Sequence, residues 1–173
     1  MGTRRIVQLA TLVVLCAVGV AVAMAATGSH GHGGTVKAAD DATFGSLLVS
    51  SSGMTLYHLT TEKPGSIACT GSCATVWPPL VLGSGAKVIA GSGVTASKLG
   101  TIRRPDGRLQ VTYGGIALYR YSLDRKSGDV EDQGSQGIWY ALTPAGTRAK
   151  AGTAPAPTTT TTMDSGGGYG YGR

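Results

Sequence analysis

Residues 108–121 read RLQVTYGGIALYRY, and this stretch decides the fold. Leu109, Val111 and Tyr113 alternate with polar residues, which is the pattern of a half-buried β-strand. Gly114-Gly115 then separates this run from a second β-like run. A two-residue glycine loop in this setting is typical of a β-hairpin, because the favoured turns need positive φ angles. The stretch therefore predicts an antiparallel hairpin.

The hairpin belongs to an internal repeat, because the chain aligns with itself without a gap at a shift of 62. The identical pairs are Gly45/Gly107, Leu47/Leu109, Val49/Val111, Gly53/Gly115, Leu56/Leu118, Tyr57/Tyr119, Trp77/Trp139 and Leu80/Leu142. Two copies are too few for an open solenoid. We therefore expect an all-β domain of two pseudo-symmetric hairpin-containing repeats, about 44–84 and 106–146, closed as a barrel or a sandwich.

Further short elements are predicted around the hairpins. The turn Pro105-Asp106-Gly107 suggests a strand at 100–103, and a short strand is expected at Lys87–Ala90. Residues 72–76 suit one helical turn, and 139–142 suit a short closing strand.

The ends of the chain differ from its middle. Arg4 and Arg5, an apolar run and an A-x-A site predict a signal peptide at 1–25, or a membrane anchor if this segment stays uncleaved. We expect a flexible leader at 26–41, the β domain at 42–146, and a disordered Thr/Pro- and Gly/Tyr-rich tail at 147–173. These features predict a secreted or cell-envelope protein.

The charge is modest. The full chain carries +6, and removal of residues 1–25 with their two arginines leaves +4. The densest basic cluster is Arg103-Arg104 with Arg108, which is sparse for a nucleic-acid surface. We expect no nucleic-acid partner, whereas a cell-wall polymer or a surface protein is compatible with this charge. The sequence gives no indication of the oligomeric state.

Cys69 and Cys73 remain after signal cleavage, and export to an oxidising compartment predicts a disulfide between them. A redox pair is the alternative, although its usual spacing is C-x-x-C. Zinc would need two more ligands, and His58 is the lone histidine of the predicted domain. We expect neither a metal nor a cofactor.

Several blocks resemble one bacterial family. Tyr119, Tyr121 and Asp124 match the motif of secreted repeats, or predicted lipoproteins, with a conserved Yx(FWY)xxD signature. CTGSCATVWPPL at 69–80 and GDVEDQGSQGIWYAL at 128–142 resemble other blocks of that family. The resemblance covers about residues 44–146 and implies no established activity. The first repeat departs from the signature, because Leu59 replaces an aromatic residue and Glu62 replaces the aspartate.

The motif allows two interpretations. Tyr119, Tyr121, Asp124 and Trp139 could form a binding platform, because tyrosine offers a flat apolar face with a hydroxyl. Alternatively the rings pack in the core, and Asp124 accepts backbone N–H bonds at a strand end. The repeat-equivalent residues of the first half are Tyr57, Glu62 and Trp77.

No catalytic set is visible, since no G-x-S-x-G surrounds a serine and the predicted domain has one histidine. We therefore expect a non-catalytic extracellular or envelope module that binds a surface polymer or a protein partner, or has a structural role. The alternative is an extracellular redox or metal-handling protein that uses Cys69, Cys73 and the Tyr/Trp residues.

Overall fold

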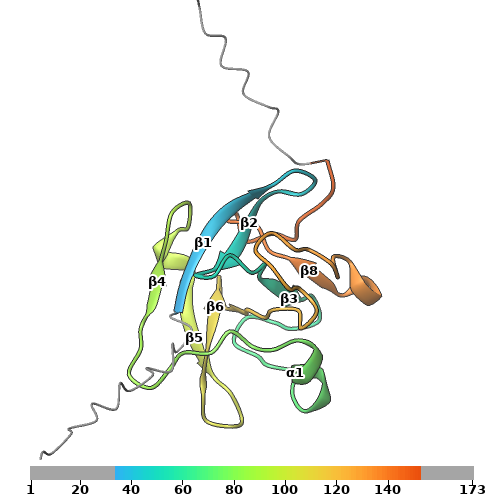
Figure 1. The fold of residues 1–173 in the computed structure, drawn as a ribbon. Helices are drawn as coiled ribbons and strands as arrows, with labels where there is room; N and C mark the ends of the chain where they lie inside the picture. The colour runs from blue at the N-terminus through green and yellow to red at the C-terminus, as the bar shows by residue number, and fades with distance from the viewer. Residues whose placement is uncertain (1–33, 153–173) are drawn as a thin grey trace, which may run out of the picture.

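The computed structural model describes residues 34–152, which form short strands with little helix (Figure 1). The elements are β1 (Gly34–Asp41), β2 (Gly45–Ser50), β3 (Tyr57–Leu59), α1 (Ser72–Val76), β4 (Val88–Ala90), η1 (Ala96–Lys98), β5 (Leu99–Arg103), β6 (Leu109–Tyr113), β7 (Ile116–Ala117), η2 (Ser135–Gly137) and β8 (Trp139–Ala141).

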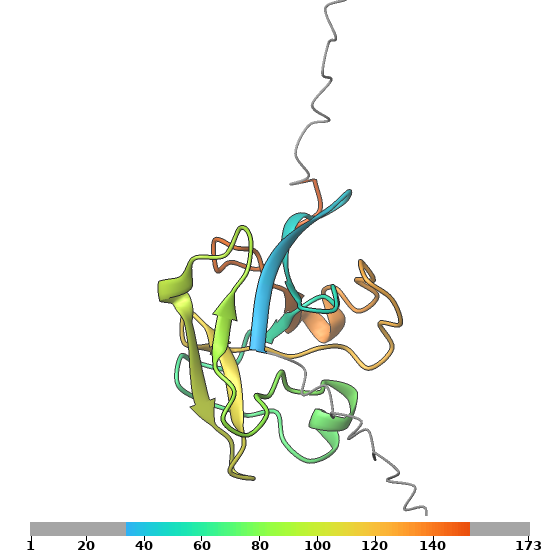
Figure 2. The ribbon, with the colours of Figure 1, turned by 60° about the vertical axis from the view of Figure 1, so that its left-hand side comes forward.

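Three small sheets make up the domain. Their strand orders are β2-β1-β4, β3-β8 and β5-β6-β7. All neighbouring strands are antiparallel except β1 and β4, which are parallel. β4 and β5 lie on one side of the molecule and α1 lies on the other (Figures 1 and 2). Within residues 34–152 the sheets do not join into a closed barrel.

The two halves exchange strands across a pseudo-twofold axis. β3 of the first half pairs with β8 of the second half. In the reciprocal position, Tyr119 of the second half forms a bridge with Pro79 of the first half. Leu80 N–H donates to the Leu118 carbonyl, and Leu142 N–H donates to the Leu56 carbonyl. Each half therefore completes the other, as a closed pseudo-symmetric domain requires.

The repeat register changes by one residue inside the hairpins. In the ladders Val36 pairs with Ser50, and Leu99 pairs with Tyr113, so β1 and β2 correspond to β5 and β6 at a spacing of 63. The ungapped alignment at 62 is therefore wrong for Leu47/Leu109 and Val49/Val111. The cause is the turn after β2, which is one residue longer than the Gly114-Gly115 turn after β6.

Two apolar clusters of buried side chains form the core. The first contains Leu47, Tyr57, Leu59, Cys69, Trp77, Ala117, Tyr119, Trp139, Ala141 and Ala149. The second contains Val36, Leu48, Leu56, Leu80, Val111, Tyr113, Leu118 and Leu142. Both clusters draw on both halves, so neither half buries its apolar face alone.

Most expected local elements are confirmed. The Gly114-Gly115 hairpin connects β6 and β7, α1 covers the helical turn expected at 72–76, and β4, β5 and β8 lie within a residue or two of their predicted ranges. No helix within the described residues is long and apolar enough to span a membrane.

The expected domain boundaries need correction at both ends. Residues 34–41 form β1 rather than a leader, and Val36 is fully buried because β1 pairs with both β2 and β4. At the other end, Ala149 is buried and its N–H donates to the Ala141 carbonyl, so the tail starts later than residue 147. The signal peptide at 1–25, the rest of the leader and the tail beyond 152 lie outside the described residues.

We predict that Val36→Ala lowers the free energy of unfolding by about 2 kcal/mol, because it leaves a cavity in a closed core. Thr35→Ala, on the opposite face of β1, is the matched control and should change it by less than about 0.5 kcal/mol. Chemical denaturation of the two variants measures this. Equal small effects would contradict the assignment of β1 to the domain.

Candidate functional site

The centre of the molecule is a pair of repeat-equivalent tyrosines. Tyr57 N–H donates to the Tyr119 carbonyl at 2.8 Å, and Tyr119 N–H donates to the Tyr57 carbonyl at 2.9 Å. Such a reciprocal pair is the closely spaced unit of an antiparallel ladder. Because the two residues occupy the same place in their repeats, the pseudo-twofold axis passes between them.

Two tryptophans meet on the same axis. The rings of Trp77 and Trp139 stack with centroids 4.0 Å apart and an interplanar angle of 6°. Tyr57 packs edge-on against Trp77 and Tyr119 packs edge-on against Trp139, each with centroids 5.2 Å apart. Aromatic pairs in such geometries stabilise a core beyond the area they bury. The tryptophans of the two repeats are therefore a shared core and not two separate sites.

The tyrosine hydroxyls bind carboxylates of the opposite half. Tyr57 OH donates to Asp124 Oδ2 at 2.9 Å, and Tyr119 OH donates to Glu62 Oε1 at 2.7 Å. All four side chains are buried. The carboxylate of each repeat thus fixes the tyrosine of the other repeat, which explains why an acidic residue recurs at this position.

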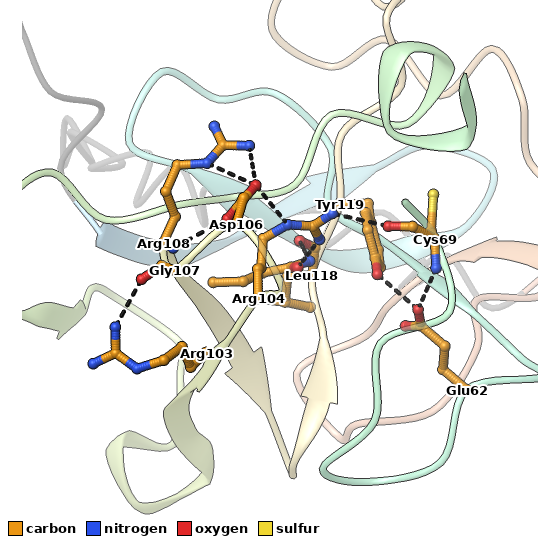
Figure 3. A network of polar contacts seen from close by, with 10 residues as sticks. Glu62, Cys69, Arg103, Arg104, Asp106, Gly107, Arg108, Leu118 and Tyr119 are labelled. Carbon is orange, nitrogen blue, oxygen red and sulfur yellow. Dashed lines mark hydrogen bonds and ion pairs between the residues drawn. The ribbon is translucent and has the colours of Figure 1, made fainter. Parts of the chain in front are cut away.

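Glu62 also organises the loop before α1 (Figure 3). Its Oε1 accepts the N–H groups of Ala68 at 2.6 Å and Cys69 at 3.1 Å, while Oε2 is buried without a hydrogen-bond partner. The Cys69 carbonyl accepts a bond from the Arg104 guanidinium at 2.9 Å, and this arginine also binds Gln110 Oε1. A polar chain therefore links Tyr119 to the turn after β5.

Asp124 is the counterpart in the second half. Its Oδ1 accepts the Glu131 N–H at 3.1 Å, so it fixes its own loop as Glu62 does. Burial is the main cause that raises the pKa of Asp124 above its ordinary value, and the Tyr57 hydroxyl and Glu131 N–H oppose this shift. Burial also raises the pKa of Tyr57 and Tyr119, and the partner carboxylates add to it. Both tyrosines therefore act as neutral donors.

The second face of β3 carries the one histidine of the described residues. His58 alternates with Tyr57 and pairs with Tyr140 across the ladder. Its Nε2 is buried without a hydrogen-bond partner. Burial lowers the pKa of His58 below 6.5, and the positive charge of Arg148 lowers it further.

The densest basic cluster of the sequence is split. Arg104 turns inward, as described above, whereas Arg108 stays exposed and donates two bonds to Asp106 Oδ2 (Figure 3). The hydrogen bonds from Arg108 lower the pKa of Asp106 to about 2. This arrangement is a local turn and offers no broad basic surface.

The disulfide between Cys69 and Cys73 is formed, with Cα atoms 5.3 Å apart. It ties the loop that supplies the Cys69 N–H and carbonyl to the first turn of α1. Those contacts support a structural role for the bridge. The described residues contain no group of three or more His, Cys, Asp or Glu side chains arranged to hold a metal.

The residues expected to form a platform gather in one place, and three of them are almost completely buried. Tyr119 is 0 % exposed, Trp139 3 % and Asp124 6 %. Tyr121 is only partly buried and lies against Trp77, with centroids 4.8 Å apart at 36°. Tyr119 and Asp124 are therefore placed as the packing interpretation of the motif expects, in the core, whereas the Tyr121 ring is partly exposed.

Sequence reasoning missed two parts of the site. Arg104 and Gln110 complete the polar chain. The alternating pattern predicted a half-buried strand with Gln110 on its exposed face, but β6 is buried on both faces and Gln110 is fully buried. Sequence reasoning also missed a surface groove of about 790 Å³ between the β1–β2 turn and the C-terminal loop. This end groove is lined by Ala38, Phe44, Ser46, Gly93, Thr143, Pro144, Ala145, Thr147, Arg148 and Lys150.

Comparison with known protein families gives a match to a family described as a secreted repeat of unknown function. Its model matches residues 38–81 and 100–143. These matches cover just over half of the chain, and they are offset by the same 62 residues as the internal repeat. The chain belongs to this family of secreted repeats, which supports an extracytoplasmic location. No curated protein and no solved structure matches the chain.

We predict that Tyr57→Phe lowers the free energy of unfolding by about 1–3 kcal/mol, because it removes a donor from the buried carboxylate of Asp124. Tyr140→Phe, at a partly exposed ring, should cost less than about 0.5 kcal/mol. In a double-mutant cycle with Asp124→Asn, the two changes should be non-additive. Additive losses would show that the hydroxyl and the carboxylate do not interact.

We predict that the stability of the fold depends on pH through His58. The folded pKa of His58 lies below its unfolded value, so the unfolded chain binds more protons as the pH falls through about 6.5. The contribution of neutral His58 to stability is therefore present above that pH and is lost below it. The melting temperature should fall between about pH 7.5 and about pH 5.5. In the His58→Gln variant the melting temperature should fall less over this pH range. A pH profile identical to that of the wild type would contradict a lowered pKa of His58 in the folded protein.

Proposed function

We propose that the protein is a non-catalytic extracytoplasmic module that binds an anionic polymer of the cell surface through the end groove. The observation that carries the proposal is the lining of the groove. Two basic residues, Arg148 and Lys150, lie there beside the ring of Phe44, and no carboxylate lines it. Repeated phosphate or carboxylate groups are the chemistry that such a surface complements.

The side chains around the cations support binding of a hydroxylated polymer. Ser46, Thr143 and Thr147 place hydroxyl-bearing side chains along the groove. Arg148 lies over the ring of Tyr140, with the guanidinium carbon 5.2 Å from the ring centroid. A stacked guanidinium is held in place and still has N–H donors for an anion. The same basic side chains can therefore bind either the phosphate groups or the carboxylate groups of a polymer.

The loops that build the groove are fixed. Gly152 N–H donates to the Thr43 carbonyl, which joins the C-terminal loop to the β1–β2 turn. Tyr113 OH donates to the Pro144 carbonyl at 2.7 Å, and Lys98 Nζ donates to the Ala145 carbonyl at 2.7 Å. Because the walls are held from two sides, binding there needs little ordering of the protein.

The test measures binding of the full secreted protein to two soluble polymers, poly(glycerol phosphate) and polygalacturonate, and to neutral dextran. We predict binding to one or both anionic polymers that weakens with salt, and none to dextran. The double variant Arg148→Gln/Lys150→Gln should bind about tenfold more weakly. Arg125→Gln/Lys126→Gln, which removes two exposed cations outside the groove, is the matched control and should bind like the wild type.

Three outcomes would overturn the proposal. They are no binding to either anionic polymer, equal binding to dextran, and equal weakening in the two double variants. Thermal unfolding of each variant separates a loss of binding from a loss of fold. If phosphate and carboxylate polymers differ, the stronger one identifies the chemistry of the natural ligand.

A further inference from the structure

The two halves differ at one position next to the stacked tryptophans. Tyr121 lies against Trp77, with ring centroids 4.8 Å apart. The repeat-equivalent residue is Leu59, which pairs with Trp139 in the β3–β8 ladder. Leucine has no ring, so the contact that covers Trp77 has no aromatic counterpart at Trp139. This is the position at which the first repeat departs from the tyrosine-aromatic signature.

A hollow of about 400 Å³ lies at this position and is here called the axis pocket. It is lined by Leu59, Thr61, Ser72, Cys73, Val76, Trp77, Gln136, Ile138 and Trp139. Both halves contribute, and Val76/Ile138 and Trp77/Trp139 are repeat-equivalent pairs. The volume is within the range of small-molecule sites in proteins. The pocket shares no lining residue with the end groove.

The lining selects an uncharged ligand. None of the residues around the axis pocket carries a charge at neutral pH, and most of its wall is aliphatic or aromatic. A charged group would lose its hydration there without gaining a partner. Thr61, Ser72 and Gln136 supply hydroxyl and amide groups that suit a single polar substituent.

Gln136 adds a second observation. Its φ is 51° and its ψ is 14°, and it is the one non-glycine residue of the described chain with positive φ. A left-handed conformation at such a residue costs stability and recurs at ligand sites. Gly134, two residues before it, and Gly137, directly after it, also have positive φ. The turn that brings Gln136 to the pocket therefore keeps a backbone conformation that lowers the stability of the fold.

We propose that the axis pocket binds a small uncharged phenol. The ring lies at Leu59, against Trp139, as the Tyr121 ring lies against Trp77. The phenol hydroxyl bonds to the polar side chains of Thr61, Ser72 or Gln136. The ligand ring would thus take the place that Tyr121 has in the second repeat, because the first repeat has Leu59 and no aromatic ring at the equivalent position.

The test uses p-cresol, which is the tyrosine side chain without its backbone. Titration is followed by NMR at the two indole N–H signals of the chain. We expect a saturable shift with a dissociation constant on the order of 1 mM, as suits a ligand of so few atoms. 4-Methylbenzoate has the same ring with a negative charge and should bind at least about tenfold more weakly.

Variants decide whether the binding occurs in this pocket. Leu59→Tyr restores the signature and places a ring in the hollow, so it should weaken p-cresol binding at least about tenfold. Leu59→Ile keeps the volume and should bind like the wild type. If Leu59→Tyr does not fold, Val76→Trp blocks the pocket from a position that is 46 % exposed. Absence of a saturable shift in the wild type, or unchanged binding in a folded blocking variant, overturns the proposal.

Discussion

The reciprocal backbone bonds between Tyr57 and Tyr119 are the constraint on which the rest of the structure depends. They bring equivalent strands of the two repeats to one axis. Once the strands meet there, Trp77 and Trp139 must share the space beside it, and parallel stacking at 4.0 Å is how they fill it. Neither repeat can form this core alone, because each tryptophan stacks on the tryptophan of the other half and each tyrosine backbone pairs with the tyrosine of the other half.

The crossed carboxylates extend the same constraint outward. A buried carboxylate is destabilising unless hydrogen-bond donors surround it. Each carboxylate here accepts one hydrogen bond from a tyrosine hydroxyl of the opposite half and at least one from a backbone N–H of its own loop. Glu62 and Asp124 therefore connect the axis to the loops that carry α1 and η2. The difference in length between the two side chains accompanies a real asymmetry: the Glu62 loop contains the disulfide, and the Asp124 loop does not.

The sequence predicted the parts of the fold that depend on local pattern. The glycine hairpin at 114–115, the helical turn at 72–76 and the repeat itself follow from alternation, turn chemistry and self-similarity. It did not predict β1, because small and polar residues at 34–41 give a weak strand signal, and only pairing with β2 and β4 orders them. It also did not predict the end groove, since this surface joins residues far apart in the chain.

The symmetric features of this protein thus explain its architecture, and its asymmetric features are where ligands are proposed to bind. The direct test of the shared core is an NMR measurement of proximity between the indole rings of Trp77 and Trp139. The chain contains two tryptophans, so the assignment is unambiguous. Rings stacked at 4.0 Å predict strong cross-relaxation peaks between the two indole ring systems. If both indoles show contacts to other side chains but none to each other, the shared axis is contradicted.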